Sequence, residues 1–449
     1  MVSTIGSSMT SFAITIWAWE LTGQATVLAL VIFFTQVPRV LISPLAGLIV
    51  DRYNRKLLIM IGDTVAALST LGILLLSLTG NLQIWHLYVA GAIEGTFGQI
   101  QELAALSSIT MLVPKQHYGR ASGMISLLEY GSKIFSPALA SVLYYAIGLV
   151  GILSIDLFTF VFAISTVLFL HIPQPPAQDR LKQFKIQNSK FKIVLEKLRK
   201  KRGLDSIFTG KFIWQEIIFG FHYIFSHPGL LALLITSSLF QFAHDIGGAL
   251  YAPMILARSG NDAQVLGSVA AAAGVGGVVG AIIVSIKGVP KPRIHGLLLG
   301  MVGAGLSKIV FGLSRMPLMW IPAQFCSSLN FPLMSSSRDA IWLAQVKPQV
   351  QGRVFATRSV IMLITSAIAP LIAGTLADKV FEPAMMPGGS LANTFGGIFG
   401  TGRGAGMALL YVIASFCLLV VGVSGYTSKA VREVETILPD GDRNYSNLP

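Results

Sequence analysis

Charged residues are scarce in this sequence of 449 residues. Asp, Glu, Lys and Arg make up 12% of the chain, whereas 53% of the residues are hydrophobic and the mean hydropathy is +0.70. Soluble domains usually carry about 25% charged residues. The scarcity of charge therefore excludes a soluble protein and predicts an integral membrane protein.

Residue patterns that bind metals or catalyse covalent chemistry are also missing. The two cysteines, Cys326 and Cys417, lie in apolar segments without metal-pair spacing, so we expect them to pack as small apolar residues. No His-Glu-x-x-His motif is present, and Gly210-Lys211-Phe212 lacks the hydroxyl of a phosphate-binding loop. We therefore expect no cofactor, no metal site and no enzyme activity, and an ion gradient as the energy source.

Long apolar segments make up most of the chain. A helix needs about 20 mainly apolar residues to cross the hydrocarbon core, because its backbone must satisfy its own hydrogen bonds there. The pattern predicts an all-α integral membrane protein with twelve transmembrane helices. Their predicted ranges are 1–21, 25–50, 57–79, 84–113, 120–147, 149–171, 229–257, 264–286, 294–314, 318–346, 355–377 and 405–426.

Basic residues outnumber acidic ones by 33 to 20, and their distribution is uneven. If both chain ends are cytoplasmic, the connections on that side hold most of the Lys and Arg, including the run from Arg180 to Lys211. The opposite side holds only Arg258, Arg315, Lys379 and Arg403. Because cytoplasmic loops carry the excess of basic residues, this asymmetry predicts a multi-pass protein of the cell membrane with both termini cytoplasmic. It also removes the need for a nucleic-acid partner.

The start of the sequence is unusual. The first predicted span begins at Met1 without a basic flank, which indicates a chain that starts inside a helix and a true start codon further upstream. A cleaved signal peptide is the competing interpretation, although no charged leading region is present.

Residues 172–228 divide the predicted spans into two groups of six. We expect an N-terminal six-helix bundle at 1–171 with a truncated first helix, a basic cytoplasmic linker with an interfacial helix at 172–228, a C-terminal six-helix bundle at 229–426 and a cytoplasmic tail at 427–449. The basic stretch within the linker would lie on an anionic membrane surface. A solvated linker is the alternative.

A repeat relates the two groups of spans. Five residues recur with the same separation of 233 positions, namely Gly47 and Gly280, Val113 and Val346, Gly119 and Gly352, Arg120 and Arg353, and Pro137 and Pro370. A constant separation favours duplicated halves with the same orientation. Such halves enclose a cavity near the middle of the membrane and rock around it, which is the geometry of alternating access.

The segment "GLIVDRYNRK" (47–56) resembles the loop signature of the major facilitator superfamily, Gly-x-x-x-Asp-Arg-x-Gly-Arg-Lys, with Asn54 in place of the glycine. The segments "DRYNRKLLIMIGD", "VPKQHYGRASG" and "FEPAMMPGGSLANTFGGIFGTGRGAGMA" are similar to the branch that contains macrolide-efflux proteins and the enterobactin exporter. This resemblance implies twelve transmembrane helices in two pseudo-symmetric six-helix bundles. The antiporter signature Gly-Pro-x-x-Gly appears only as the variant Ser136-Pro137-Ala138-Leu139-Ala140.

The charged loop after the second span predicts a cytoplasmic latch. Asp51 can accept from Arg55 or lie against the positive amino-terminal end of the helix that begins near Arg353. The resemblance implies the second arrangement, which would close the cytoplasmic side; ordinary positive-inside anchoring is the alternative. The residues assigned to this predicted latch are Gly47, Asp51, Arg52, Arg55, Lys56, Asp63, Arg120 and Arg353.

Ionisable residues near the middle of spans predict the coupling and substrate site. A charge at the centre of a membrane helix costs about 2.5–3.5 kcal/mol, so it needs a partner, water or a function. We expect Glu94, Gln101 and Glu102 to form one polar stripe facing the cavity. Glu129 and Lys133 are either a functional or a self-neutralised pair. The full predicted set is Arg39, Glu94, Gln101, Glu102, Glu129, Lys133 and Asp245.

Other ionisable residues have more modest expected roles. His244 either joins a proton relay with Asp245 or makes a local hydrogen bond. Another four residues lie nearer the predicted helix ends and are expected to form interface pairs: Asp156, Lys308, Arg338 and Asp339.

These features predict a secondary active transporter that exports an amphipathic organic compound, such as a macrolide-like drug or a siderophore, in exchange for protons. The expected partners are the small-molecule substrate, protons and the lipid bilayer, and the protein is expected to be a monomer. A lipid or lysolipid flippase and an uncoupled facilitator are alternatives within transport. A transporter-like receptor or a membrane-embedded enzyme is the alternative of a different class.

Overall fold

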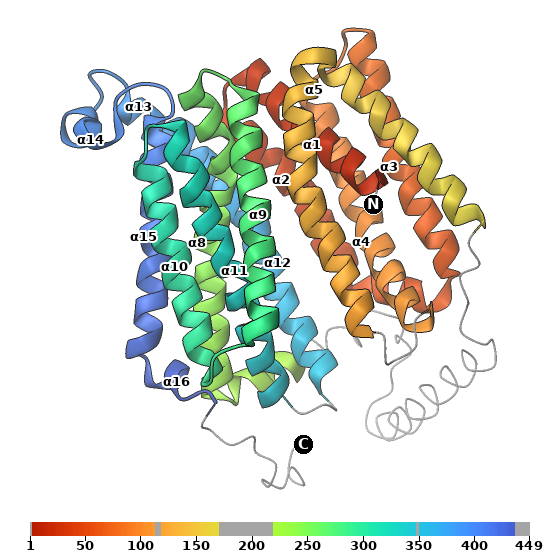
Figure 1. The fold of residues 1–449 in the computed structure, drawn as a ribbon, viewed down its shortest axis with the longest axis vertical. Coiled ribbons are helices and arrows are strands. Elements are labelled where there is room, and N and C mark those ends of the chain that lie inside the picture. The colour runs from red at the N-terminus through yellow and green to blue at the C-terminus, as the bar shows by residue number, and fades with distance from the viewer. Residues whose placement is uncertain (1, 113–117, 170–218, 347–349, 436–449) are drawn as a thin grey trace, which may run out of the picture.

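The computed structural model describes residues 2–112, 118–169, 219–346 and 350–435, and these residues form helices and no strand. Figure 1 shows their arrangement. The first half of the chain contains α1 (Val2–Thr22), α2 (Ala25–Arg52), α3 (Arg55–Leu78), α4 (Ile84–Leu112) and α5 (Tyr118–Phe169). α5 comprises two consecutive helices, because Gly148 has a φ of 66° and interrupts the helical backbone.

The second half begins after the predicted linker, of which residues 172–218 lie outside the described chain. Its long helices are α8 (Pro228–Ser259), α9 (Ala263–Lys287), α10 (Arg293–Leu313), α11 (Pro317–Gln345), α12 (Gln351–Leu376) and α15 (Ala405–Thr427). The π-helix η2 (Ala377–Phe381) continues α12, and α13 (Glu382–Met385) and α14 (Ala392–Phe399) form an excursion at the upper end of Figure 1. α16 (Lys429–Arg432) follows α15 at the lower end, and residues 436–449 of the predicted tail are not described.

The helices agree with the predicted spans to within a few residues, and the predicted break after residue 147 falls at Gly148. In the described chain, eight helical segments are long and apolar enough to cross a membrane. The predicted spans 1–21, 84–113 and 318–346 are not among these eight, because hydroxyl, amide and carboxylate side chains interrupt their apolar sequence. The helical membrane fold is confirmed, and the number of twelve spans stays a prediction.

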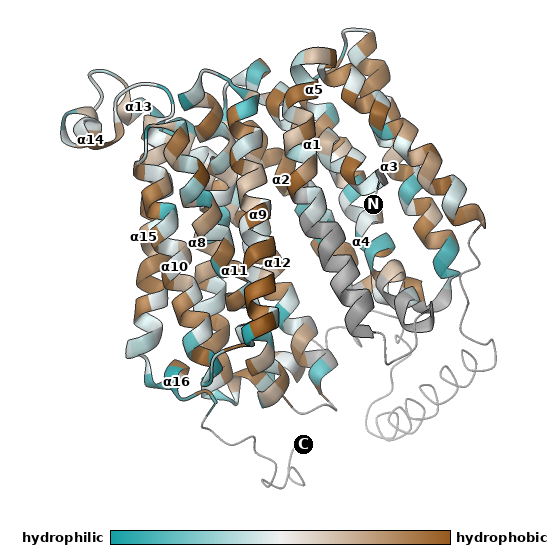
Figure 2. Cartoon of the chain, in the orientation of Figure 1, coloured by the Kyte–Doolittle hydropathy of each residue, from teal (hydrophilic) through white to brown (hydrophobic). Residues whose placement is uncertain are grey.

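Hydrophobic residues, coloured brown in Figure 2, make up much of every long helix, and many large apolar side chains are exposed on the outside. Phe158, Phe162, Leu68, Ile286 and Leu318 are all more than half exposed. Apolar patches of this extent are unfavourable in water but match the hydrocarbon of a bilayer. The outer surface of the molecule is therefore suited to lipid contact.

The structure repeats itself with the separation seen in the sequence. α4 and α11 each contain 29 residues and begin at Ile84 and Pro317, which lie 233 positions apart. α5 and α12 begin with the same separation, at Tyr118 and Gln351. The packing repeats too, since α4 lies against α2 and α3 just as α11 lies against α9 and α10. The two halves are therefore built to one plan.

Contacts between the halves come mainly from two helix pairs, α2 with α12 and α5 with α9. Small residues bring these helices close together. A Cβ atom added to Gly374 of α12 would lie 2.7 Å from the Cα of Thr26 in α2, and one added to Gly267 of α9 would lie 2.5 Å from the Cβ of Ser141 in α5. Both contacts lie toward the upper end of Figure 1, where α2 and α9 begin.

Candidate functional site

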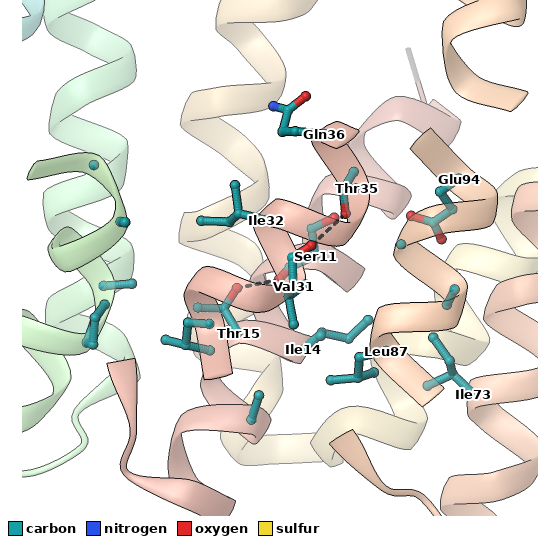
Figure 3. Close-up of a pocket in the computed structure, with 18 residues that line it drawn as sticks. Ser11, Ile14, Thr15, Val31, Ile32, Thr35, Gln36, Ile73, Leu87 and Glu94 are labelled. Carbon is teal, nitrogen blue, oxygen red and sulfur yellow. Dashed lines mark hydrogen bonds between the residues drawn. The ribbon is translucent and has the colours of Figure 1, made fainter. Parts of the chain in front are cut away.

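A cavity of about 370 Å³ opens between α1, α2, α3 and α4 of the first half and α8 of the second half (Figure 3). Its wall is mostly apolar and contains small residues, so it has room for a hydrophobic ligand. The lining residues are Ser11, Ile14, Thr15, Ala18, Leu28, Val31, Ile32, Thr35, Gln36, Ile73, Leu87, Ala90, Gly91, Glu94, Gly248, Ala249, Ala252 and Pro253.

The polar groups of the cavity wall are arranged to accept hydrogen bonds. Ser11, Thr15 and Thr35 each donate the hydroxyl hydrogen to the backbone carbonyl four residues earlier, at 3.1, 2.8 and 2.9 Å. Their oxygen lone pairs stay available on the cavity side. The Oε1 atom of Gln36 is buried and has no hydrogen-bond partner among the described residues. A ligand that carries N–H or O–H groups fits this wall better than one that carries only acceptors.

Glu94 is the ionisable residue of this cavity wall. It projects from α4 toward α1 and α2, and its side chain is exposed to the cavity (Figure 3). Among the residues that the structure describes, none donates a hydrogen bond to the Glu94 carboxylate or pairs with it as a cation. A carboxylate in this setting can bind a proton or a cationic ligand, so its predicted role in coupling stays a prediction.

The other members of the predicted polar stripe do not lie beside Glu94. Glu102 forms an ion pair with Arg39 of α2, whose Nε also donates to Oε1 of Gln99 at 2.8 Å. Gln101 instead donates to Asp63 of α3 at 2.6 Å. The expectation of one stripe facing the cavity was wrong for this reason: Gln101 and Glu102 are adjacent in α4 and therefore point toward different neighbouring helices.

Asp245 lies in α8 but outside the cavity wall. Its carboxylate accepts hydrogen bonds from Gln241 in the same helix at 2.8 Å and from Ser366 of α12 at 2.7 Å. His244 points elsewhere, because its ring lies 4.9 Å from that of Phe331 and its buried Nδ1 has no partner among the described residues. The structure therefore does not join His244 and Asp245 into a relay.

Two ionisable residues are more deeply buried than the sequence predicts. Asp156 is 6% exposed and accepts hydrogen bonds from Ser7, Thr10 and Thr70 at 3.1, 3.1 and 3.3 Å. Lys308 is 4% exposed.

The Nζ atom of Lys308 donates to the Tyr411 hydroxyl at 3.3 Å and lies 5.4 Å from the centre of that ring. Neither Asp156 nor Lys308 forms an ion pair within the described chain, so the expectation of interface pairs was wrong for both. Their position along the chain suggested helix ends, whereas neighbouring helices bury them.

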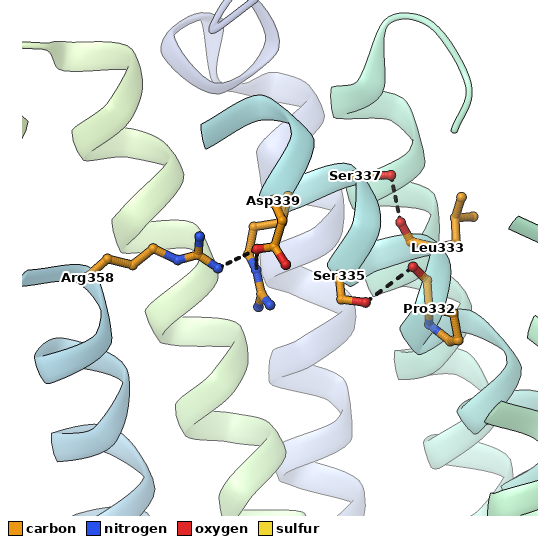
Figure 4. A network of polar contacts seen from close by, with 7 residues as sticks. Pro332, Leu333, Ser335, Ser337, Asp339 and Arg358 are labelled. Carbon is orange, nitrogen blue, oxygen red and sulfur yellow. Dashed lines mark hydrogen bonds and ion pairs between the residues drawn. The ribbon is translucent and has the colours of Figure 1, made fainter. Parts of the chain in front are cut away.

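A charged network occupies the lower part of the second half, where α11 ends and α12 begins (Figure 4). Asp339 pairs with Arg358 at 2.7 Å and with Arg338 at 3.3 Å. The Arg358 guanidinium also lies 5.4 Å from the Trp342 ring, a typical cation–π distance. The interface pair predicted for Arg338 and Asp339 is confirmed, with Arg358 as its third member.

A comparison with protein families decides the class of this protein. A family model described as "Major Facilitator Superfamily" matches residues 1–288, which is more than half of the chain. The chain belongs to the major facilitator superfamily. It is therefore a multi-pass membrane transporter that moves a small molecule, and it is not an enzyme.

Relatives within this superfamily include efflux proteins. The chain is 26% identical over 383 residues to "Macrolide efflux protein A" of Streptococcus pyogenes, covering 84% of this chain and 87% of the relative. It is 25% identical over 336 residues to "Macrolide efflux protein A" of Enterococcus faecalis, covering 74% of this chain and 95% of the relative. These similarities agree with the predicted resemblance to macrolide-efflux proteins.

Solved structures of superfamily transporters have the same fold. The nucleoside transporter NupG (D323A mutant) matches with a TM-score of 0.61 at 12% identity, over 94% of this chain and 96% of that one. A bacterial homologue of the iron transporter ferroportin in an inward-facing state matches with a TM-score of 0.62 at 13% identity, over 94% of this chain and 95% of that one.

The superfamily signature occupies the lower ends of α2 and α3. Asn54, which replaces the glycine of the signature, is the N-cap of α3 and accepts a hydrogen bond from the Leu57 amide at 3.3 Å. Lys56 donates to the Leu168 carbonyl at 2.9 Å, which ties the loop to the end of α5. Gly47 has open space around it, with no atom within 4 Å of an added Cβ.

The structure describes the remaining residues of the predicted latch, and the predicted pair Glu129 and Lys133, only in part. Asp63, assigned to the latch, is bonded to Gln101 of α4 instead of contacting the second half. The backbone helices that carry Asp51, Arg52, Arg120, Glu129, Lys133 and Arg353 are described, but the side chains of these residues lie outside the described set. The latch itself stays a prediction.

Proposed function

We propose that this transporter exports an amphipathic organic amine, of the macrolide-like class, by alternating access and in exchange for protons. The observation that carries the proposal is Glu94, a carboxylate without a described partner in a cavity of apolar and hydrogen-bond-accepting groups. The 26% identity to a macrolide efflux protein supports the same class of substrate. An anionic siderophore fits this wall less well, because its charge would repel Glu94.

The cavity chemistry supports competition between substrate and proton. An ammonium group of the substrate would pair with the ionised Glu94 while the apolar body contacts side chains such as Ile14, Ile32 and Leu87. A proton on Glu94 would remove the charge that holds the ammonium group and would release the substrate. If substrate binds from one side and the proton from the other, the proton gradient drives export.

The orientation of the transporter in the membrane is inferred from its charge asymmetry. Positive-inside charge would place the lower end of Figure 1 in the cytoplasm, with both termini on that side of the cell membrane. Each monomer contains a complete cavity between its own two halves, which supports transport by a monomer.

Proton-coupled transport is tested in reconstituted vesicles. We expect the parent protein to accumulate a radiolabelled macrolide when a pH gradient is imposed. In Glu94→Gln this gradient-driven accumulation should fall at least tenfold, because glutamine neither binds the proton nor attracts the ammonium group by charge. Glu102→Gln is the comparison variant, since Glu102 is already paired with Arg39. It should keep its dependence on the gradient.

Two outcomes would contradict the proposal. Accumulation by the parent that ignores the pH gradient would indicate an uncoupled facilitator. Equal losses in Glu94→Gln and Glu102→Gln would show that Glu94 has no special role.

A further inference from the structure

Among the side chains that the structure describes, hydrogen bonds between the two halves lie at one end of the molecule. Within the described chain, the five bonds that cross from residues 2–169 to residues 219–435 all lie at the upper end of Figure 1. They join Trp19 Nε1 to Asn261 Oδ1, Tyr145 Oη to the Asn261 carbonyl, the Ala263 amide to Tyr145 Oη, and the amides of Ala25 and Thr26 to Asp378.

The beginning of α2 depends on the other half for its cap. The first amides of a helix lack partners within the helix, and a preceding side chain usually accepts from them. Gln24, at the N-cap of α2, makes no such bond. Asp378 of the second half replaces it, because its two carboxylate oxygens accept from the Ala25 amide at 3.0 Å and from the Thr26 amide at 2.7 Å. Its negative charge also faces the positive end of the helix.

The repeat provides a second cap across the halves. Tyr145 and Asp378 are separated by 233 positions, the separation that relates the two halves. Tyr145 accepts from the Ala263 amide at 2.9 Å, and Ala263 is the first residue of α9. Each half therefore caps the first amide of a helix in the other half from the equivalent position. The two caps differ in that Asp378 accepts with a carboxylate and Tyr145 with a phenol oxygen.

The two helices differ in how far their first amides rely on the cap from the other half. α9 also has a cap of its own, because Asp262 accepts from the Gln264 and Val265 amides at 2.8 and 3.2 Å. α2 has no such cap within its own half. Asp378 lies in the π-helix η2, a rare conformation that is frequent at functional sites. Loss of the Asp378 carboxylate would therefore leave the Ala25 and Thr26 amides of α2 without an acceptor, whereas α9 would keep its own cap.

We propose that Asp378 and Tyr145 form a pair of caps across the halves that holds the upper end closed, and that Asp378 contributes most of its strength. This inference rests on the proposed alternating access. When the upper end opens, α2 moves away from η2, and the Ala25 and Thr26 amides lose their acceptor. Removal of the carboxylate removes this cost of opening, so the population shifts toward the state that is open at the upper end.

Thiol labelling measures this shift without any substrate. Leu28 lines the cavity directly below the caps and is 5% exposed, so a cysteine there is shielded from the upper side while the caps are closed. We would introduce Leu28→Cys after replacing Cys326 and Cys417 by alanine. A membrane-impermeant maleimide is then applied to intact cells or to inverted vesicles. A second reporter, Gln36→Cys, is placed further along α2 toward the lower end.

We expect Asp378→Ala to raise labelling of Leu28→Cys from the upper side by about twofold to thirtyfold, the effect of losing one helix cap. Labelling of Gln36→Cys from the lower side should fall in the same variant. Asp378→Asn keeps one acceptor and should lie between parent and alanine. Tyr145→Phe should cause a smaller increase than Asp378→Ala.

Asp262→Ala is the matched control, because it removes a carboxylate cap at the same end within one half. It should label like the parent. An equal increase in Asp262→Ala would overturn the inference, as would unchanged labelling in Asp378→Ala. Labelling that rises from both sides would indicate unfolding and would also contradict it. Failure of macrolide transport with the expected labelling pattern would refute the proposed function and leave the caps intact.

Discussion

Asp156 illustrates how this protein keeps a charge inside its first half. A buried carboxylate is costly unless hydrogen bonds satisfy it. Asp156 has hydroxyl donors from Ser7 and Thr10 of α1 and from Thr70 of α3. It thereby joins three helices that form one side of the first half. The sequence identifies the three hydroxyl residues and the acid, but nothing in their spacing predicts that α1, α3 and α5 bring them together.

We expect Asp156→Ala to lower the free energy of unfolding by about 1–3 kcal/mol, because three buried hydroxyls lose their acceptor. Asp156→Asn should cost less, since the amide oxygen still accepts. The measurement is thermal unfolding of the purified protein in detergent. In a double-mutant cycle, Thr10→Val should cost less in the Asp156→Ala background than in the parent. Additive effects would show that Thr10 and Asp156 do not interact.

At the scale of helices, much of the fold is predictable from the sequence. Apolar runs bounded by glycine, proline and charged residues place the helices within a few residues, including the break at Gly148. Contacts between helices are less predictable, because they depend on how each helix is rotated about its axis. This is why Glu94 lies in the cavity wall, whereas Gln101, which the sequence places in the same stripe, faces Asp63.

The cap of α3 provides a prediction at the helix scale. Asn54 replaces the glycine of the superfamily signature and accepts from the Leu57 amide. We expect Asn54→Ala to lower the free energy of unfolding by about 0.5–2 kcal/mol, and Asn54→Gly by only a few tenths, because glycine is tolerated at an N-cap without a side-chain bond. Thermal unfolding in detergent distinguishes the two variants. If alanine and glycine are equivalent, the side-chain bond of Asn54 does not stabilise the helix.

At the scale of the whole molecule, the antiparallel helices α2 and α12 both run between the upper and the lower end of Figure 1. Asp378 lies at the upper end of this pair and caps α2. Asp51 is the second-last residue of α2, at the opposite end of that helix, where the predicted latch would act in the alternative state. The sequence signature points only to Asp51. Asp378 follows no known pattern in the sequence, because its partner is a backbone amide more than 350 residues away.

Asp51 and Asp378 are expected to stabilise closure of opposite ends, so their removal should shift the conformational equilibrium in opposite directions. Asp51→Asn should weaken closure of the lower end by about 0.3–2 kcal/mol, the range of a charge at a helix end. It should slow transport with little change in substrate affinity, since the predicted latch acts on closure of the lower end and not on the substrate. With the two cysteine reporters, Asp51→Asn should raise labelling of Gln36→Cys from the lower side and reduce labelling of Leu28→Cys from the upper side.

The double variant Asp51→Asn/Asp378→Asn tests whether the two ends share one equilibrium. Each substitution changes the free-energy difference between the two open states with opposite sign, so the effects should largely cancel and labelling should return toward the ratio of the parent. Because the two residues lie at opposite ends of α2, their effects on this free-energy difference should add. The labelling of the double variant can therefore be calculated from the two single variants. Labelling in the double variant that follows Asp378→Asn alone would show that Asp51 anchors its loop and takes no part in closing the lower end.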